Sequence, residues 1–352
     1  MNDSPPLELF IDKKAKPIAC HKAAQIPIHF KHIVEEEIRR DVKLGVLEEV
    51  PPNTPTTWCS HMCIQTKKKG KPRRVIYLQP VNRHAVRQTY IGESPFEIVN
   101  EVPTNTFRNT VDAWNGYHSV PIKEEDRHVT TFIAPWGRFR YRTTPQGFIT
   151  AQDAYNHRFD LITRDFKHKK RCVDDSIIWG NTVEEIFMRT CEYLSLTSAA
   201  GIIMNSDKFK FAERCVEFLG LELKENSIKT GGELINSIRD FSRPQDLSST
   251  RSWFGLIEQV AWGFSKAKVM EPFRHLLKPK SDFKWTHDLN HAFEMSKEEI
   301  IQAIKHGVKT FEPNKPNCLA TDWSKEGIGF CLLQKRCEWS NLTPICCPGV
   351  WE

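Results

Sequence analysis

The sequence predicts a mixed α+β fold with more than one domain, and three observations support this. The length of 352 residues exceeds that of a typical single domain. Short β-prone runs alternate with amphipathic segments up to about residue 230, and residues 230–306 are mainly helical. From Cys318 onward the chain returns to strand character, in "CLATDWSKEGIGFCLLQ".

Composition narrows the class of protein. Hydrophobic content of 39% and charged content of 27% indicate a globular chain rather than a disordered one. The formal net charge of +6 is compatible with an anionic partner. No apolar run is long enough to span a membrane, and "MNDSPPLELF" lacks the features of a signal peptide. We therefore expect an intracellular protein, with no membrane partner and with its 11 cysteines as thiols.

The first elements lead to a basic turn. Residues 1–25 are expected to form an extended lead-in. A helix should follow and end near Gly45, with its apolar face formed by Phe30, Ile33, Val34, Ile38 and Val42. Residues 58–66 and 73–81 are predicted strands, joined by "KKKGKPRR", in which six of eight residues are basic. This turn is suited to binding phosphates, although a solvated loop is the alternative.

Two turns and a helix come next. A strand within residues 106–122 should enter a turn near Asn115 and Gly116. Residues 128–144 are predicted to form a β-hairpin around Trp136 and Gly137. The stretch 143–166 is a turn that leads into a helix, for which Thr150 is the expected N-cap and Asp153 the capping-box partner. The buried stripe of this helix should contain Ala151, Tyr155, Phe159, Ile162 and Phe166.

The remaining elements are mostly helical. A helix over about 182–200 should end at Gly201, and residues 211–230 are predicted to form two short strands. Residues 248–277 should contain two helices and 288–306 a further one.

Two adjacent carboxylates stand out in the β-prone run "CVDDSIIW". Aspartate is disfavoured in strands, so Asp174 and Asp175 indicate either a tight turn or a bound cation. Asp112 also follows an apolar strand and precedes a turn. Three carboxylates at neighbouring strand ends could hold two Mg²⁺ ions for in-line phosphoryl transfer.

Two groups of cysteines are weaker candidates for metal sites. Cys59 and Cys63 flank His61, but no second ligand pair follows at a usual zinc spacing. Buried residues on a strand are therefore the favoured interpretation of this group. For the second group, incidental thiols are favoured over metal ligands: Cys331, Cys337, Cys346 and Cys347.

The order of these motifs resembles that of reverse transcriptases of LTR retrotransposons, in particular the gypsy class that shares ancestry with retroviruses. The resemblance covers residues 20–335. It implies a right-hand polymerase, with fingers and palm over 26–225, thumb and connection over 226–315, and a truncated ribonuclease H-like segment over 316–352. The implied activity is RNA- and DNA-templated DNA synthesis.

The resemblance also assigns roles to residues. Asp112, Asp174 and Asp175 match the metal-binding aspartates, and Lys208 matches a lysine near the leaving pyrophosphate that could donate a proton. The dNTP should be bound by Arg73, Lys68, Tyr117, Gln146 and Gly147, among which Tyr117 would exclude a ribose 2′-OH. The primer end should be positioned by Phe218, Leu219 and Gly220.

The ribonuclease H-like segment is expected to be inactive. Asp322 matches the first metal ligand of that family, but no later acidic residue matches the others. Such a site needs several carboxylates to hold two ions.

Three departures from the family pattern leave the activity open. Cys172 replaces the usual tyrosine before the aspartate pair. Tyr77 and Gln79 stand where the family usually has an Asp and an Arg. The third departure is the expected truncation of the ribonuclease H-like segment. The expected cofactors are two Mg²⁺ ions, with Mn²⁺ as a substitute. The expected partners are dNTPs and a primed RNA or DNA template, with a second copy or other parts of the pol polyprotein as further candidates. The alternative hypothesis is a relic that binds nucleic acid but barely catalyses; a host-recruited structural protein has no support in the sequence.

Overall fold

The structure is a computed structural model that describes residues 1, 4–66, 72–114, 116–263, 269–278, 283–305, 307–311, 314–323, 328–334, 343–344 and 349–351. The chain divides into two compact units. Unit 1 contains residues 1–93, 111–176 and 188–209, and unit 2 contains residues 94–110, 177–187 and 210–352. Each unit is described separately.

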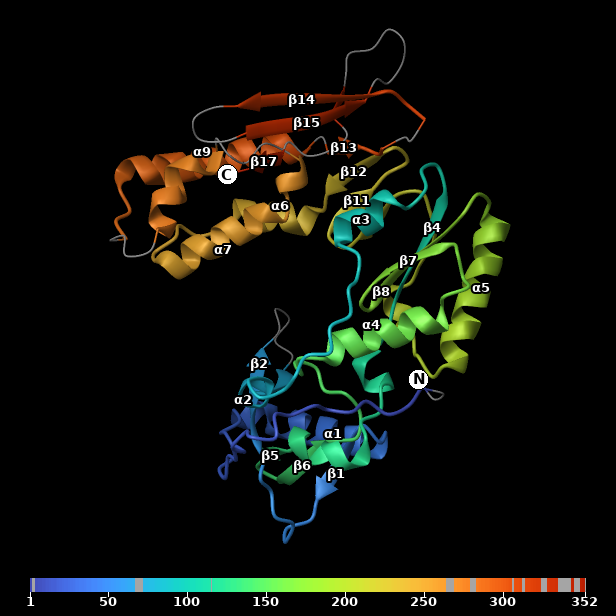
Figure 1. The fold of residues 1–352 in the computed structure, drawn as a ribbon, viewed down its shortest axis with the longest axis vertical. Coiled ribbons are helices and arrows are strands. Elements are labelled where there is room, and N and C mark those ends of the chain that lie inside the picture. The colour runs from blue at the N-terminus through green and yellow to red at the C-terminus, as the bar shows by residue number, and fades with distance from the viewer. Residues whose placement is uncertain are drawn as a thin grey trace. The chain divides into compact units, whose positions relative to one another are not determined.

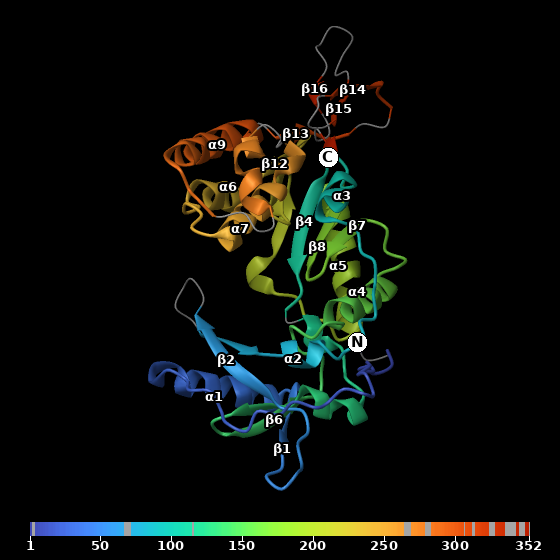
Figure 2. The ribbon, with the colours of Figure 1, turned by 60° about the vertical axis from the view of Figure 1, so that its left-hand side comes forward.

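A five-stranded sheet forms one part of unit 1 (Figure 2). Its strand order is β1-β6-β5-β2-β3, and all neighbours are antiparallel except β2 and β5. The strands are β1 Leu47–Val50, β2 Ser60–Thr66, β3 Pro72–Ile76, β5 Phe132–Ala134 and β6 Gly137–Tyr141. The predicted hairpin is therefore confirmed as β5–β6. The predicted strand over 73–81 was too long, because β3 ends at Ile76 and Pro80 lies in the first turn of the short helix α2 (Gln79–Asn82).

Helix α1 (Ile28–Lys43) packs against β1 and β3 of this sheet. It ends at Leu44, before Gly45 with a φ of +72°, as the sequence predicted. Its buried face contains Val34 and Ile38, but Ile33 is exposed, so that part of the predicted face was wrong. Asp41 is buried there instead, because Arg74 of β3 donates a 2.6 Å hydrogen bond to its carboxylate.

A second sheet has the order β7-β8-β4-β9. Its strands are β4 Phe107–Asp112, β7 Lys169–Cys172, β8 Asp175–Gly180 and β9 Lys210–Glu213. The boundary between the units runs through β4 and β8, and their carboxylate-bearing ends belong to unit 1.

Helices α4 (Ala151–Ile162) and α5 (Val183–Ala199) accompany this sheet (Figure 1). Tyr155 and Phe159 of α4 are fully buried, as predicted, and Phe159 lies 6.4 Å from the Tyr193 ring of α5. Thr150 is the N-cap residue of α4, as predicted, but its side chain makes no capping hydrogen bond. Asp153 binds Arg87 and the backbone N–H of Tyr90 instead of completing a capping box.

The other elements of the first 210 residues are short. Helix α3 spans Pro95–Asn100 in unit 2. Three 3₁₀ helices lie in unit 1: η1 Gly116–Ser119, η2 Glu124–Thr130 and η3 Ser206–Lys208.

Two further sheets belong to unit 2. The first has the order β10-β11-β12-β13, with strands β10 Val216–Phe218, β11 Leu221–Leu223, β12 Ser227–Thr230 and β13 Val308–Lys309. Three of these strands lie in the region where two were predicted, because tight turns divide it. The second sheet contains β14 Asn317–Trp323, β15 Ile328–Gln334, β16 Thr343–Pro344 and β17 Gly349–Trp351.

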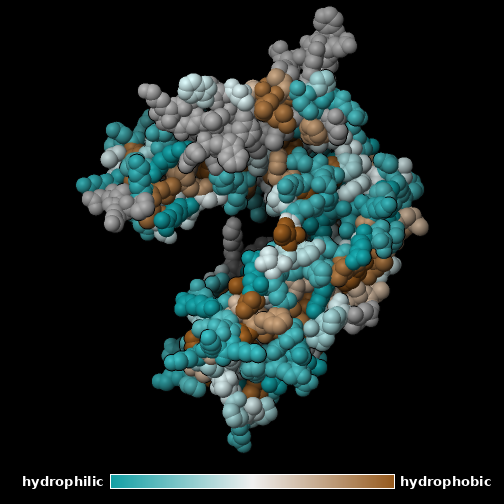
Figure 3. Space-filling model, viewed as in Figure 1, coloured by the Kyte–Doolittle hydropathy of each residue, from teal (hydrophilic) through white to brown (hydrophobic). Residues whose placement is uncertain are grey.

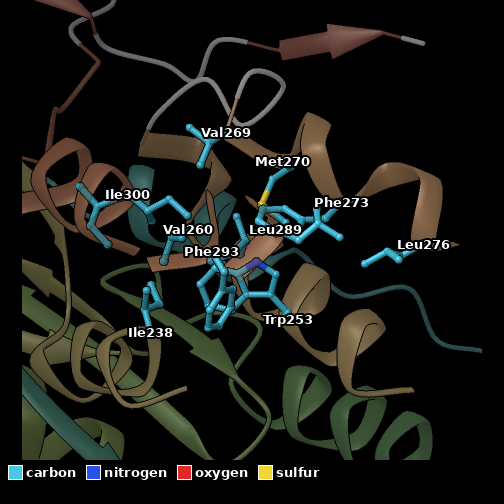
Figure 4. Packing of buried hydrophobic residues seen from close by; sticks show 12 residues of the cluster. Ile238, Trp253, Val260, Val269, Met270, Phe273, Leu276, Leu289, Phe293 and Ile300 are labelled. Atoms are coloured by element: carbon cyan, nitrogen blue, oxygen red, sulfur yellow. The ribbon is translucent and has the colours of Figure 1, made fainter. Parts of the chain in front are cut away.

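The helices of unit 2 enclose an apolar cluster rich in aromatic rings (Figure 4). Trp253, Phe273 and Phe293 are its fully buried rings, with the Trp253 and Phe293 centroids 5.0 Å apart. The helical elements are α6 Gly232–Arg239, α7 Leu247–Glu258, η4 Ala261–Gly263, η5 Glu271–Leu277 and α9 His287–Lys305. Among the described residues, no helix is both long and apolar enough to cross a membrane. The surface in Figure 3 is predominantly hydrophilic.

Candidate active site

The three predicted aspartates come together in unit 1. Asp112 is the last residue of β4, and Asp174 and Asp175 lie at the turn from β7 into β8. The backbone N–H of Ala113 donates to the Asp174 carbonyl at 2.8 Å, which joins the two strand ends. The backbone N–H of Asn205 donates to the Asp112 carbonyl at 2.8 Å and brings η3 to the same place.

The carboxylates lie in an unfavourable electrostatic environment. Burial, followed by the charges of Asp112 and Asp175, raises the pKa of Asp174 to about 6. Burial and Asp112 also raise the pKa of Asp175. The Asp174 Oδ1 atom is buried without a hydrogen-bond partner in the described part of the chain. A cation placed here would relieve both the repulsion and the unsatisfied oxygen.

Lys208 supplies the positive charge that the structure does contain. Its Nζ donates to Asp112 Oδ2 at 2.7 Å, and this hydrogen bond raises the pKa of Lys208. Within the described residues, no three His, Cys, Asp or Glu side chains are arranged to hold a metal ion directly. The donor set nevertheless suits Mg²⁺, since all of its ligands would be carboxylate oxygens. Binding would require Lys208 to release Asp112 and the carboxylates to reorient.

Gly116 allows the cluster to be this compact. A Cβ atom at this position would lie 2.5 Å from Asp174 Oδ1 and 2.5 Å from the Tyr155 hydroxyl. The turn predicted near Asn115 and Gly116 is present as η1, although Asn115 itself lies outside the described residues.

Tyr117 is half-buried beside the carboxylates. Its ring centroid is 5.4 Å from that of Tyr155. Burial, followed by the charge of Asp174, raises the pKa of Tyr117 to about 12, so its hydroxyl remains protonated. Tyr117 does not line the polar pocket beside the carboxylates that is described next.

A polar pocket of about 660 Å³ opens between the carboxylates and the basic strand β3. Asp112, Asp174 and Lys208 line one side, and Arg73, Gln146 and Gly147 line another. Arg73 donates to Gln146 Oε1 at 2.9 Å. The pocket therefore brings together six of the residues that the sequence assigned to the metal and nucleotide sites. Lys68, which was assigned to the same nucleotide site, lies outside the described residues.

Asn82 holds the turn that carries Gln146 and Gly147. Its Nδ2 donates to the Gly147 carbonyl at 2.8 Å, and its Oδ1 accepts the Ile149 N–H at 3.0 Å. Gly147 has a φ of +88°, where a residue with a side chain would be strained. The sequence analysis missed Asn82, although its place directly after the basic hairpin and "QP" was a usable signal.

The departures from the family pattern are locally compensated. The Tyr77 hydroxyl donates to Gln79 Oε1 at 2.5 Å, so a neutral pair stands where the family has two charges. Cys172 is half-buried at the end of β7.

The cysteine groups show no metal site among the described residues. Cys59 is buried, as expected, but Cys63 is exposed, so the prediction was wrong for this residue. The Cys20 Sγ and His61 Nδ1 atoms form a hydrogen bond of 3.1 Å. Cys337, Cys346 and Cys347 lie outside the described residues, as does the side chain of Cys331.

The remaining predicted residues belong to unit 2. Phe218 ends β10 with its side chain buried, and Leu219 and Gly220 form the turn into β11 with φ values of +54° and +76°. Asp322 lies on β14, paired with Gly329 of β15.

Comparison with known proteins identifies the class. Residues 64–223 match the family model of reverse transcriptase (RNA-dependent DNA polymerase). Residues 64–223 are therefore similar to a reverse transcriptase domain, and this match supports the resemblance inferred from the motifs.

The curated relatives are transposon proteins. Over 308 residues the chain is 24% identical to the Transposon Tf2-3 and Tf2-4 polyproteins of Schizosaccharomyces pombe. The match covers 86% of this chain but 22% of each relative, so the chain spans about a fifth of their length.

Solved structures confirm the predicted fold. The chain matches the foamy viral protease-reverse transcriptase in complex with dsDNA with a TM-score of 0.81 and 19% identity, covering 99% of this chain and 72% of that one. The same enzyme in complex with an RNA/DNA hybrid gives a TM-score of 0.81 and 18% identity, covering 99% and 46%. At this identity the match establishes the right-hand polymerase fold and leaves the function to be argued from the site.

Proposed function

We propose that this chain performs RNA- and DNA-templated DNA synthesis, transferring nucleotides from dNTPs to a primer 3′-OH. The observation that carries the proposal is the half-buried cluster of Asp112, Asp174 and Asp175. It borders a pocket whose opposite wall presents Arg73 and Gln146. Phosphoryl transfer requires mainly positioning and charge neutralisation, and these two groups of residues supply both.

In this proposal the three aspartates hold two Mg²⁺ ions, or Mn²⁺ in their place. The bound ions would neutralise phosphate charge and make the primer hydroxyl more acidic. Arg73 and Lys68 bind the triphosphate, and the backbone at Gly147 lets the nucleotide approach closely. Lys208 moves from Asp112 toward the leaving pyrophosphate, where its ammonium can donate a proton. Tyr117 excludes nucleotides with a 2′-OH.

The partners follow from the same chemistry. Foamy viral reverse transcriptases of this fold have been captured with dsDNA and with an RNA/DNA hybrid. We assign a primed RNA or DNA template to this chain, with primer positioning by Phe218, Leu219 and Gly220. Binding through the phosphate backbone should weaken as salt rises. A second copy or other parts of a polyprotein are further partners in this proposal. It implies a compartment that holds template RNA and dNTPs: the cytoplasm, a virus-like particle or the nucleus.

Primer extension on poly(rA)–oligo(dT) tests the proposal. Purified protein should incorporate dTTP with Mg²⁺ or Mn²⁺, and Asp174→Asn should abolish incorporation. Asp165→Asn is the matched control, because Asp165 is an exposed carboxylate that does not line the pocket. Activity equal in Asp174→Asn and wild type would refute the assigned site.

The same assay addresses the alternative of a relic that binds nucleic acid without catalysis. Absence of incorporation by the folded wild-type protein, with salt-dependent binding of the duplex retained, would support that alternative.

A further inference from the structure

Arg171 is a buried charged residue that the proposed chemistry does not use. It lies on β7, three residues before Asp174, and only 4% of its side chain is exposed. Nη2 and Nε donate to Asp160 Oδ1 at 2.6 and 3.2 Å. Nη1 donates to Asn156 Oδ1 at 3.0 Å, and the guanidinium lies 4.5 Å from the centre of the Phe159 ring. All three partners belong to α4.

Arg171 also forms a hydrogen bond with the turn that contains the aspartates. Nη1 also donates to the Val173 carbonyl oxygen at 2.6 Å. That carbonyl belongs to the peptide bond between Val173 and Asp174, so its orientation fixes the start of the Asp174 backbone. Arg171 therefore links the backbone of the turn directly to α4.

Val173 makes such a link necessary. Its φ is +54°, in the left-handed region that β-branched residues strongly avoid. Strained backbone persists only where surrounding contacts hold it. Among the described residues, Arg171 is the side chain that binds this carbonyl, and its own position is fixed by Asp160 and Asn156.

Asp160 is held in turn by a second partner. The Tyr90 hydroxyl donates to Asp160 Oδ2 at 2.8 Å, so the Asp160 carboxylate is bound on both oxygens. The chain of contacts from Tyr90 through Asp160 and Arg171 to Val173 is continuous within unit 1.

We infer that Arg171 is a positioning residue, which holds Val173 in its strained conformation so that Asp174 and Asp175 present their carboxylates to the metal ions. This inference rests on the proposed function, because it assumes that these carboxylates bind metal. A buried ion pair that only stabilises the fold is the competing explanation, and it predicts no effect on metal affinity.

The test compares Arg171→Met with Arg87→Met. Arg87 also forms a bidentate pair with an aspartate of α4, Asp153, but it forms no hydrogen bond with the turn among the described residues. Mn²⁺ binding is measured by water proton relaxation, beside the Mg²⁺ concentration for half-maximal primer extension. Arg171→Met should weaken metal binding roughly 10-fold or more, as is typical when a group that orients a metal ligand is removed. Arg87→Met should leave both quantities unchanged.

A second substitution separates positioning from stability. Glycine adopts positive φ without strain, so Val173→Gly should restore much of the metal affinity in the Arg171→Met background. If Arg171→Met lowers the melting temperature without changing metal affinity, or if Val173→Gly restores nothing, the inference is wrong. Arg171→Lys, which keeps the charge but loses the planar fork, provides the same comparison should Arg171→Met fail to fold.

The two readouts distinguish this inference from the proposed function. A wild-type protein that binds Mn²⁺ through Asp174 but incorporates no dTTP would contradict the polymerase, while the Arg171 comparison would remain valid on Mn²⁺ binding. A wild-type protein that binds no Mn²⁺ would overturn the inference itself.

Discussion

The carboxylate cluster of unit 1 is half-buried and the apolar cluster of unit 2 is fully buried, and the two differ in how well their neighbours satisfy them. In unit 2, Trp253 and Phe293 pack edge to face within a cluster of apolar side chains, although the buried Trp253 Nε1–H has no hydrogen-bond partner among the described residues. In unit 1, the Asp174 Oδ1 atom has no hydrogen-bond partner among the described residues and lies near the charges of Asp112 and Asp175. The backbone of Val173 is strained because its φ is positive. The comparison teaches that unit 2 gains stability from its buried residues, whereas unit 1 gives up stability to keep a site prepared for a cation.

Asp174→Asn should produce the largest effect and sharpen this comparison. Loss of a metal ligand should reduce primer extension by roughly 10³-fold, about 4 kcal/mol of transition-state stabilisation. The melting temperature should rise, because the pKa of Asp174 is raised to about 6 in the folded protein. A raised carboxyl pKa means that ionisation costs folding free energy, and this cost is fully present above pH 6 and absent below about pH 4.

Calorimetry at pH 7 and near pH 4 measures that difference. The stabilisation by Asp174→Asn should be a few degrees at pH 7 and should shrink at the lower pH. A variant that is less stable than the wild type at pH 7 would show that the cluster is not under the electrostatic strain described here.

Phe293→Ala should have the largest effect on stability. Removal of a fully buried aromatic ring typically costs about 3–5 kcal/mol. The thermal transition of unit 2 should therefore fall by roughly 10 °C. Met295→Ala on the same helix is the control, because Met295 is exposed and should shift the transition little. Equal shifts in the two variants would contradict the assignment of the core.

Gly116→Ala tests the compactness of the carboxylate cluster. The added methyl would meet Asp174 Oδ1 and the Tyr155 ring at 2.5 Å, so one of them must move. Overpacking of this kind typically costs about 1–3 kcal/mol. We expect a higher Mg²⁺ concentration for half-maximal primer extension as well as a lower melting temperature. Gly92→Ala, where a Cβ would meet nothing within 4 Å, should leave the Mg²⁺ requirement unchanged; a similar requirement in Gly116→Ala would argue against tight packing.

The sequence predicted the site better than the contacts that support it. The three aspartates were predicted from their places at the ends of β-prone runs, whereas Arg73 and Gln146 were predicted from the resemblance to the family, and the structure places Arg73 and Gln146 in one pocket with Asp112 and Asp174. Arg171 was missed because its partners Asn156 and Asp160 lie on another element, and their spacing to Arg171 has no local signature. Contacts between residues far apart in the sequence also explain the errors. Asp41 is buried instead of Ile33 because Arg74 of β3 donates a hydrogen bond to its carboxylate. Asp153 forms hydrogen bonds with Arg87 and therefore does not complete the predicted capping box.

The pair of Asp153 and Arg87 provides the smallest expected effect, on the boundary between the two kinds of burial. Burial alone would raise the pKa of Asp153, but the hydrogen bonds from Arg87 and the Tyr90 N–H outweigh it and lower the pKa. A lowered folded pKa contributes stability above the unfolded value of about 4, and this contribution is lost as the pH falls through the folded pKa. Asp153→Asn should therefore reduce the melting temperature at pH 7 by less than Phe293→Ala does, because Arg87 is largely exposed and screened by solvent. The difference in melting temperature from the wild type should narrow below about pH 4. A difference in melting temperature that stays constant with pH would mean that Asp153 stabilises the fold through the geometry of its hydrogen bonds and not through its charge. Burial of this acid would then be stabilised without any contribution from its charge, as is the burial of the apolar residues of unit 2.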